Sequence, residues 1–211
     1  MNHFSKTAIQ SWERFYRANF INCLSGFKSA TLIGTINKEN KTNLAIFSNI
    51  VHIGAAPALI GFINRPTDAA PHTIKNIEAT GFYSMNHIHS SFIKKAHQTS
   101  AKYAEGESEF EKAGLAIEWK ENIGVPFVAE SRIKYLMELT EIVPIKHNGS
   151  FLVIGAIQDV FVDETLIDKD GFLHIEKACS ITSLGIDGYY ETSLKARYKY
   201  AKPGIATEAI K

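Results

Sequence analysis

Residues 151–162 read FLVIGAIQDVFV, a nearly continuous apolar run that decides the kind of fold. Only Gln158 and Asp159 break the run, and it is long enough to bend around a closed sheet. Gly155 lies inside it, at a position where a strand can coil because glycine has no side chain to pack. Both alternating faces of the run are apolar, so something must cover each of them. These features predict a long, coiled strand of a β-barrel.

A second segment, residues 133–140, alternates apolar and polar side chains at period two, as a half-buried strand requires. Further stretches rich in β-branched and apolar residues are predicted strands: 31–36, 44–53, 58–63 and 82–88. The strands follow one another without the strand–helix alternation of a doubly wound sheet. The sequence therefore predicts a mostly β fold, a closed or nearly closed barrel with added helices, in a single domain over residues 1–211.

Helical segments are added to this sheet. Apolar side chains recur at spacings near three and four between residues 9 and 20, as in a helix that docks onto something larger, and we place them in an N-terminal helical extension over residues 1–25. Pro71 can begin a short helix that ends at Gly81. Residues 90–101 are a polar excursion with helical character, expected at the surface or in a site, and residues 105–111 read as acidic and flexible.

The composition argues against several partners. With 21% charged residues and a formal net charge of +1, the chain lacks the long-range field that draws proteins to nucleic acid or to anionic membranes. Its apolar runs are shorter than the roughly 18–20 residues that cross a bilayer, and its first residues lack the order of a signal peptide. We therefore expect a cytoplasmic protein. Cys23 and Cys179 are far apart and read as buried structural thiols.

The sequence carries none of the common signatures of enzyme sites. It contains no Gly-x-Gly-x-x-Gly, no Walker loop and no Gly-x-Ser-x-Gly, which argues against dinucleotide clamping, nucleotide hydrolysis and an elbow serine. His87, His89 and His97 could ligate a metal if a carboxylate joined them. No acidic residue lies between Asn86 and Tyr103, so we predict no metal site.

Two polar clusters interrupt the apolar pattern. The first lies inside an otherwise apolar strand, where polar side chains need partners, and comprises Asn43, Ser48, Asn49 and His52. Alternatively, these residues face outward and cap a hairpin. The second gathers about the start of the short helix and comprises Arg65, Thr67, His72, Thr73 and Lys75. Unpaired N–H groups at a helix start favour an anion such as phosphate, although an ordinary charged loop explains these residues equally well.

Taken in order, these stretches resemble the flavin reductase-like family of FMN-binding split β-barrel proteins, and in particular its flavoredoxin-like branch. The resemblance is carried first by FKSATLI at 27–33, TNLAIFSN at 42–49, PALIGF at 57–62, RP at 65–66, HTIKNI at 72–77 and GFYSMN at 81–86. It continues through AHQTS at 96–100, SEF at 108–110, AES at 129–131 and GYY at 188–190, the last within a C-terminal tail over 185–211. The ordered set is specific, and it implies a Greek-key antiparallel split barrel.

The resemblance also implies a non-covalently bound FMN and residues that hold it. In the family, the flavin ring lies along the strand with the Asn-Leu-Ala-x-Phe-Ser stretch, and the phosphate lies at the turn before the short helix. The residues implied for the flavin ring are Asn43, Phe47, Ser48 and Asn49. Those implied for the phosphate are Arg65 and Thr73, with His72 a weaker candidate. Lys95, His97 and Ser100 are expected near the exposed edge of the flavin.

The function that the resemblance implies is an FMN-dependent oxidoreductase that works as a homodimer. Electrons would pass from NADH, NADPH or a protein donor to an acceptor that the sequence does not identify, and no side chain need act as acid or base. At Asn49-Ile50 the commoner reductases carry a second hydroxyl, which argues against ordinary flavin reductase activity here. The alternatives are a non-catalytic flavin carrier or sensor, and a β-barrel interaction module without a cofactor.

Overall fold

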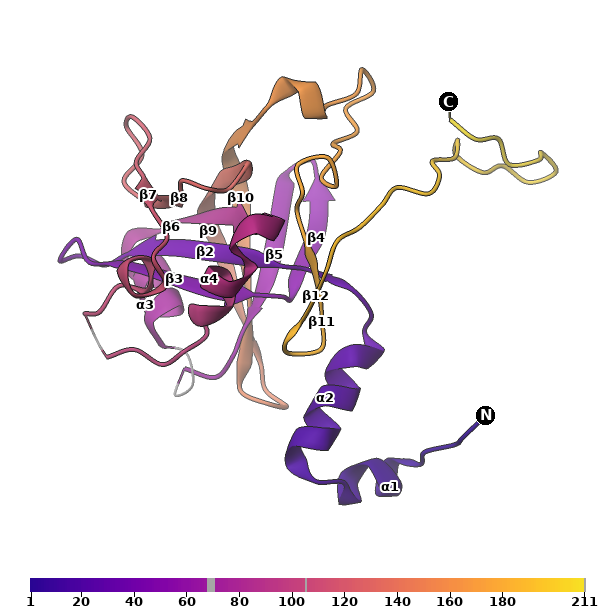
Figure 1. The fold of residues 1–211 in the computed structure, drawn as a ribbon, viewed down its shortest axis with the longest axis horizontal. Coiled ribbons are helices and arrows are strands. Elements are labelled where there is room, and N and C mark those ends of the chain that lie inside the picture. The colour runs from indigo at the N-terminus through magenta and orange to yellow at the C-terminus, as the bar shows by residue number, and fades with distance from the viewer. Residues whose placement is uncertain (68–70, 105, 211) are drawn as a thin grey trace.

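The computed structural model describes residues 1–67, 71–104 and 106–210. Across these residues, antiparallel strands form a seven-stranded sheet in the order β3-β2-β6-β9-β10-β5-β4 (Figure 1). Their bounds are β2 Thr31–Ile36, β3 Thr42–Phe47, β4 Ile50–Ala55, β5 Ala58–Asn64, β6 Phe82–His87, β9 Ile133–Ile145 and β10 Ser150–Val162. The mostly β, antiparallel fold predicted from the sequence is confirmed.

The sheet curls so that its two edge strands meet at one point. Strands β3 and β4 stand at opposite ends of the strand order, yet only Ser48 and Asn49 separate them along the chain. Such a link spans only about 10 Å, so the sheet has to bring its edges together there. The carbonyl oxygen of Asn49 accepts a hydrogen bond from the backbone N–H of Ile63 on β5 at 3.1 Å, which fixes the link to the barrel.

The prediction of one strand over residues 44–53 is wrong, because this stretch forms the ends of two strands at different edges. Strand β3 ends at Phe47 and β4 begins at Ile50. The residues on both sides of the link are apolar, so the hydrophobic pattern continues across the break. The polar pair Ser48-Asn49 marks where the strand breaks, but in the sequence this pair was interpreted as part of one strand.

Strands β9 and β10 form the longest ladder, and a bulge at Gly155 coils it. The register between the strands shifts between Ile154 and Gly155. A Cβ atom at Gly155 would collide with the Tyr83 hydroxyl and would lie 3.0 Å from the carbonyl oxygen of Glu138. Glycine is therefore required where β6 approaches the bulge, and the predicted coiling point is confirmed. Strand β9 runs beyond the predicted 133–140, because its second half continues to pair with β10.

Helices and short strands lie around the barrel. The helices are α1 Lys6–Ser11, α2 Arg14–Leu24, α3 Pro71–Thr80, α4 Ile93–Gln98 and α5 Glu109–Ala113, with 3₁₀ turns η1 Ser90–Phe92 and η2 Glu164–Leu166. Strands β1 Lys28–Ser29, β11 Thr182–Leu184 and β12 Gly188–Tyr190 form one small sheet, and β7 Ile117–Glu118 pairs with β8 Phe127–Val128. Helix α3 begins at Pro71 and is closed by Gly81, whose N–H donates to Ile77, as predicted.

The N-terminal extension forms two helices, so the prediction of one helix over residues 9–20 is wrong. The Glu13 carboxylate accepts the backbone N–H groups of Phe15 and Tyr16 at 2.7 and 3.0 Å and so caps a new helix, α2. Trp12 packs edge-on against Phe4, Tyr16 and Phe20. The apolar stripe thus packs the extension onto itself, and no residue of α1 or α2, all of them described, is fully buried. Both helices project from the barrel (Figure 1).

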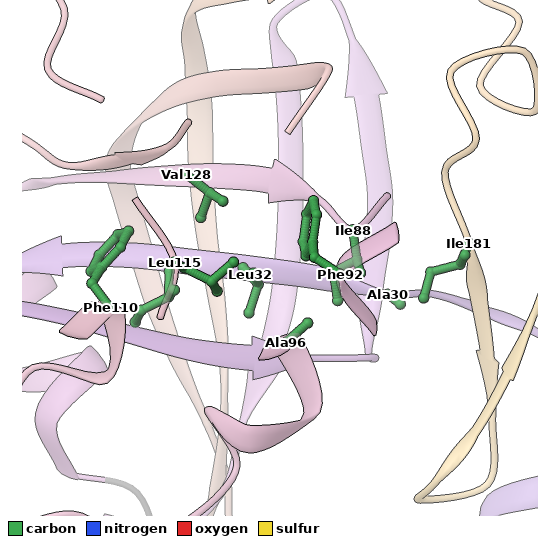
Figure 2. Packing of buried hydrophobic residues seen from close by; sticks show 10 residues of the cluster. Ala30, Leu32, Ile88, Phe92, Ala96, Phe110, Leu115, Val128 and Ile181 are labelled. Carbon is green, nitrogen blue, oxygen red and sulfur yellow. The ribbon is translucent and has the colours of Figure 1, made fainter. Parts of the chain in front are cut away.

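One hydrophobic core packs the sheet against α4 and the segments that follow it (Figure 2). Phe92 and Ala96, which lie in the excursion over residues 90–101, are 4% and 0% exposed and belong to this core. The expectation that the excursion avoids the core is therefore wrong. The prediction that residues 105–111 are flexible is also wrong for the described part of this segment, because Glu109 begins α5 and Phe110 is buried in the core. Glu105 lies outside the described residues.

A second core fills the barrel itself. Its buried members come from β2, β5, β6, β9, β10 and α3, and they are Ile33, Phe62, Ile74, Ile77, Tyr83, Met85, Tyr135, Met137 and Val153. The period-two pattern of residues 133–140 places Tyr135 and Met137 on this inner face. The barrel is thus a filled core rather than a channel, and ligands have to bind at its rim.

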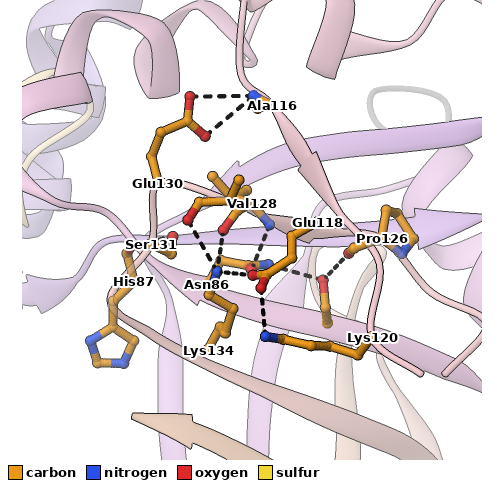
Figure 3. A network of polar contacts seen from close by, with 12 residues as sticks. Asn86, His87, Ala116, Glu118, Lys120, Pro126, Val128, Glu130, Ser131 and Lys134 are labelled. Carbon is orange, nitrogen blue, oxygen red and sulfur yellow. Dashed lines mark hydrogen bonds and ion pairs between the residues drawn. The ribbon is translucent and has the colours of Figure 1, made fainter. Parts of the chain in front are cut away.

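A buried polar network fastens the β7–β8 hairpin to the barrel (Figure 3). Lys134 on β9 is 6% exposed, and its ammonium donates to the carboxylate of Glu118 at 2.5 Å and to the Val128 carbonyl at 2.7 Å. The Asn86 side chain on β6 accepts the Val128 N–H at 2.9 Å. Buried polar groups are stable only when paired, so these bonds fix the path of the chain over this face.

Both predictions about the cysteines are wrong. Cys23 is exposed, because it lies on α2, which packs mainly against its own extension. Cys179 is partly exposed and occupies a turn, where its φ angle is 55°. Both thiols are free. The rule that isolated cysteines are buried fails here because neither residue lies on an element of the core.

Acid is expected to destabilise the fold through His87. Burial lowers the pKa of this imidazole on β6 to about 4, whereas an unfolded histidine titrates near pH 6.5. Between these values the folded ring stays neutral and the unfolded ring binds a proton. The contribution of His87 to stability is therefore complete above about pH 6.5 and is lost as the pH falls toward about 4. Urea unfolding should show that the wild type loses more stability over this range than His87→Asn; parallel profiles would contradict the assignment.

Candidate functional site

A cleft of about 820 Å³ opens along the β3 edge of the barrel. Its walls come from β3, the segment after β5, the start of α3, the segment after α4, the β11–β12 hairpin and α2. As the described residues define it, the cleft is lined by nine of the ten predicted site residues: Asn43, Phe47, Ser48, Asn49, Arg65, His72, Thr73, His97 and Ser100. Residues far apart in the sequence are thus brought to one site, and their binding roles remain predictions.

Strand β3 offers a backbone edge to the cleft. Its outer side is not covered by another strand, and the N–H of Leu44 points that way, donating to Glu109 at 2.9 Å. Alternate residues of an antiparallel strand turn their backbone groups to the same side, so Ile46 presents its N–H and C=O to the same edge. Ile46 lines the cleft. Phe47 packs edge-on against the buried Phe62, which holds its ring against the barrel.

A buried amide–hydroxyl network joins β3 to α3. The side-chain amide of Asn43 donates to the Thr73 hydroxyl at 3.2 Å and to the Thr35 hydroxyl at 3.4 Å. Asn76 donates to the same Thr35 oxygen at 3.0 Å. The Thr73 oxygen accepts from Asn43, so its own hydroxyl proton can be donated to a ligand. Asn43 therefore positions Thr73 in addition to lining the cleft.

One end of the cleft suits an anion. Arg65 is exposed just after β5, and His72 and Thr73 lie in the first turn of α3. The first N–H groups of a helix have no partner inside the helix, and the helix dipole adds partial positive charge there. A guanidinium, a hydroxyl and a helix start are the donors that hold a phosphate.

The three residues predicted for the outer edge of the cleft separate in the structure. His97 faces Tyr189 on β12, with Nδ1 at 2.8 Å from the phenol oxygen, and the Ser100 hydroxyl donates to the carbonyl of His97. Lys95 is the exception and does not line the cleft. Its ammonium donates to the carbonyl of Gly114 at 2.6 Å, on the far side of α4 from the predicted position. Helical periodicity separates Lys95 from His97, since residues two apart do not share a face.

Among the cleft residues that sequence reasoning did not assign to the site are Glu109 and Tyr189, both with a raised pKa. Glu109 is 6% exposed, and burial raises the pKa of its carboxyl group, although the bond from Leu44 and the charge of His72 oppose the shift. Glu109 and Tyr189 lie in stretches that carry the family resemblance, SEF at 108–110 and GYY at 188–190, but neither was assigned to the site, and the acidic composition of 105–111 concealed the burial of Glu109. Tyr189 is half-buried, and burial raises its pKa, so the phenol stays protonated.

The histidines considered for a metal have separate partners. His87 faces the Ser180 hydroxyl, His89 accepts the N–H of Ser91, and His97 faces Tyr189. Among the described residues, no group of three or more histidine, cysteine or acidic side chains is arranged to hold a metal ion. In the same part of the chain, no helix is both long and apolar enough to cross a membrane.

Comparison with known proteins agrees with the barrel fold. Residues 24–181 match the flavin reductase like domain, and the chain belongs to this family. A solved structure from Shewanella frigidimarina, described as a flavin reductase with a split barrel domain, is 46% identical. The match covers 95% of this chain and all of that protein, with a TM-score of 0.92. The predicted family and its split-barrel fold are confirmed.

Two more distant structures share the fold. Nitrilotriacetate monooxygenase component B from Bacillus cereus is 22% identical over 93% of this chain and 98% of its own, with a TM-score of 0.81. Flavoredoxin of Desulfovibrio vulgaris is 22% identical over 86% of this chain and 93% of its own, with a TM-score of 0.68. At such identities the comparison extends to the fold, which is therefore common to proteins with different names and roles.

Proposed function

We propose that the protein binds FMN non-covalently in the β3 cleft and acts as a flavin-dependent oxidoreductase. The observation that carries this proposal is the convergence of nine predicted site residues, from four separate stretches of sequence, on one cleft. Its volume falls in the range of roughly 300–1,000 Å³ typical of small-molecule sites. Membership of the flavin reductase-like family supports a flavin-related oxidoreductase.

The donor set of the cleft fits FMN. Arg65, Thr73 and the start of α3 would hold the phosphate, with His72 beside them. Ser48, Asn49 and the free edge of β3 at Ile46 would bind the ribityl chain and the polar edge of the ring. The flavin would supply the electron chemistry, and the protein would supply position and hydrogen bonds. Because the cleft has one anion-binding end, we propose FMN rather than FAD.

The cofactor proposal is tested by the visible spectrum of the purified protein, followed by heat release and chromatography of the ligand. Flavin bands and recovery of FMN are expected. Recovery of FAD alone would contradict the assignment, and a protein that takes up no flavin would leave the cofactor-free interaction module in its place. The electron donor is NADH, NADPH or a protein, and the acceptor is a small molecule or a protein redox partner.

The second candidate function is a non-catalytic flavin carrier or sensor. It is favoured by the departure at Asn49-Ile50 from the commoner reductases, which carry a second hydroxyl there. Incubation of the loaded protein with NADH or NADPH separates the two functions. Bleaching of the flavin bands, followed by reduction of added flavin over many turnovers, is expected for the oxidoreductase, whereas a carrier would leave the spectrum unchanged.

We also propose that the protein is a homodimer with the cleft at or beside the interface. The extension supports this, because α2 contributes Phe15 to the cleft while that ring and Leu24 remain 67% and 65% exposed. Both faces of strand β10 are apolar, and on one of them Val160 is left 52% exposed. Exposed apolar surface of this kind marks an interface. Light scattering across a dilution series should give the mass of a dimer, and a monomer that keeps FMN at every concentration would contradict it.

The place of action that we propose is the cytoplasm. Two free thiols, one of them exposed, support a reducing compartment. Fractionation of cells should recover the protein with the cytosolic fraction.

A further inference from the structure

Glu109 is a buried carboxylate in an unusual place. It lies at the start of α5 and docks on the free edge of β3, where one oxygen accepts the N–H of Leu44 at 2.9 Å. The preceding residue repeats this docking, because the Ser108 hydroxyl is 2.7 Å from the Thr42 hydroxyl. An unpaired strand edge needs such a cover, so the position of Glu109 is fixed by the barrel.

The same carboxylate lies close to the anion-binding end of the cleft. Leu44, its partner, is adjacent in the chain to Asn43, whose amide donates to the Thr73 hydroxyl at 3.2 Å. His72, next to Thr73, is near enough for its charge to affect the titration of Glu109. A phosphate held by Arg65 and Thr73 would therefore share the cleft with the buried carboxylate of Glu109.

Two like charges in a desolvated site repel each other strongly, because the effective dielectric constant is low. Water cannot screen a carboxylate that is 6% exposed. On α3, His72 is the titratable neighbour of the carboxylate; on α4, Lys95 is engaged with Gly114, and His97 faces Tyr189. Strand β3 carries no titratable side chain, and the charged neighbours on its own segment are Glu107, Glu111 and Lys112, with Lys112 paired to Glu107. Arg65, Arg14 and Lys102 also line the cleft and would offset the charge of the phosphate. A proton on Glu109 is the change that removes the buried negative charge itself.

We propose that Glu109 is a positioning residue that takes up a proton when a phosphate-bearing ligand occupies the cleft. As a neutral acid it still has an oxygen that accepts the N–H of Leu44, so the β3 edge keeps its cover while the negative charge is removed. This inference rests on the proposed function, and it deepens it by making ligand affinity depend on pH. Burial already raises the pKa of Glu109 in the ligand-free protein, so a smaller further shift is needed for the carboxylate to take up a proton.

The sign of the effect follows from linkage. Bound phosphate raises the pKa of Glu109 further, so the complex holds a proton at pH values where the free protein does not. Affinity for FMN therefore falls as the pH rises through the interval between the two pKa values. Above that interval, the wild type binds FMN against the full repulsion of an ionised carboxylate.

The test is calorimetric titration of FMN into the intact protein, in pairs of non-phosphate buffers that differ in ionisation enthalpy, which gives the protons taken up per ligand. The variant is Glu109→Gln, which is similar in size, can accept from Leu44 and cannot ionise. To separate any contribution of His72, both proteins are measured with and without His72→Gln. Riboflavin, which lacks the phosphate, is the control ligand.

The wild type is expected to take up more protons with FMN than Glu109→Gln does, in either His72 background and not with riboflavin. At pH values above the interval between the two pKa values of Glu109, Glu109→Gln is expected to bind FMN about three- to tenfold more tightly than the wild type. Infrared difference spectra of the wild type should show a protonated carboxyl band on addition of FMN, a measurement that needs no variant. Equal proton uptake together with no such band would overturn the inference. Failure of the wild type to bind FMN would instead overturn the proposed function, and this inference with it.

Discussion

Replacement of Lys134 by alanine is expected to lower the free energy of unfolding by about 3 kcal/mol. The Lys134 ammonium is buried and donates to Glu118, to the Val128 carbonyl and to the Ala129 carbonyl. Its removal leaves two carbonyl groups and a carboxylate oxygen without their donor. Since the side chain of Glu118 is 33% exposed, part of the cost is recovered by solvation, which places the effect at the lower end of the range for broken buried pairs.

Lys120 provides a matched control for this change, because it pairs with the same carboxylate of Glu118 at 2.5 Å. Its side chain is 27% exposed, against 7% for Lys134. Lys120→Ala is expected to cost about 1 kcal/mol or less, as exposed pairs do. Urea unfolding of both variants measures the difference. Equal losses would mean that the ion pair with Glu118, rather than burial and the backbone acceptors, determines the effect.

Replacement of Arg65 by alanine is expected to weaken FMN binding about tenfold or more, and to leave the stability of the protein nearly unchanged. Arg65 is exposed at the anion-binding end of the cleft, so its loss creates no cavity in the core. A charge-assisted hydrogen bond to phosphate contributes roughly 1.5–3 kcal/mol, which sets the size of the effect. Fluorescence titration of FMN into the flavin-free protein measures the affinity.

The matched control for Arg65 is Lys75→Ala, which removes another exposed cation, on α3, that does not line the cleft. It should leave FMN affinity within about twofold of the wild type, because exposed charges at a distance are screened by salt. Arg65→Lys should fall between the wild type and Arg65→Ala, since it keeps the charge and loses the planar fork. If Arg65→Ala bound FMN as tightly as the wild type, the phosphate would have to lie elsewhere.

Much of the barrel was predictable, because its strands carry the periods that burial imposes. The alternation in residues 133–140 and the apolar run over 151–162 identified β9 and β10, and Gly155 marked the bulge between them. Pro71 and Gly81 marked the limits of α3. Local backbone chemistry fixes such features, so a single sequence reveals them. Two features were missed for different reasons: the link at Ser48-Asn49 is decided by tertiary contacts, whereas the extension is divided by the local Glu13 cap, which the apolar stripe concealed.

The sequence predicted which residues line the cleft better than it predicted the contacts between them. The residues Asn43 and Thr73 could be named, but the bond between them joins β3 to α3 and has no trace in the sequence. Glu109 was missed because a short acidic segment has the composition of a loop, and its burial is imposed by the free edge of β3. Lys95 was expected near the exposed edge of the flavin, with His97 and Ser100 on the same excursion; its ammonium instead donates to the carbonyl of Gly114, and it does not line the cleft.

The strand order has a consequence for the time at which the site can form. Strand β5 pairs with β10, which lies much later in the chain, and β2 and β3 reach β5 only through β6, β9 and β10. Such non-local pairings are slow to form, because long loops have to close before any contact stabilises them. During synthesis, the residues of β3 and the Ser48-Asn49 link leave the ribosome early, yet the barrel that fixes them cannot close before β10 has emerged. Assembly of the cleft is therefore a late event, and a ligand can be captured only by a chain in which β10 has already been made.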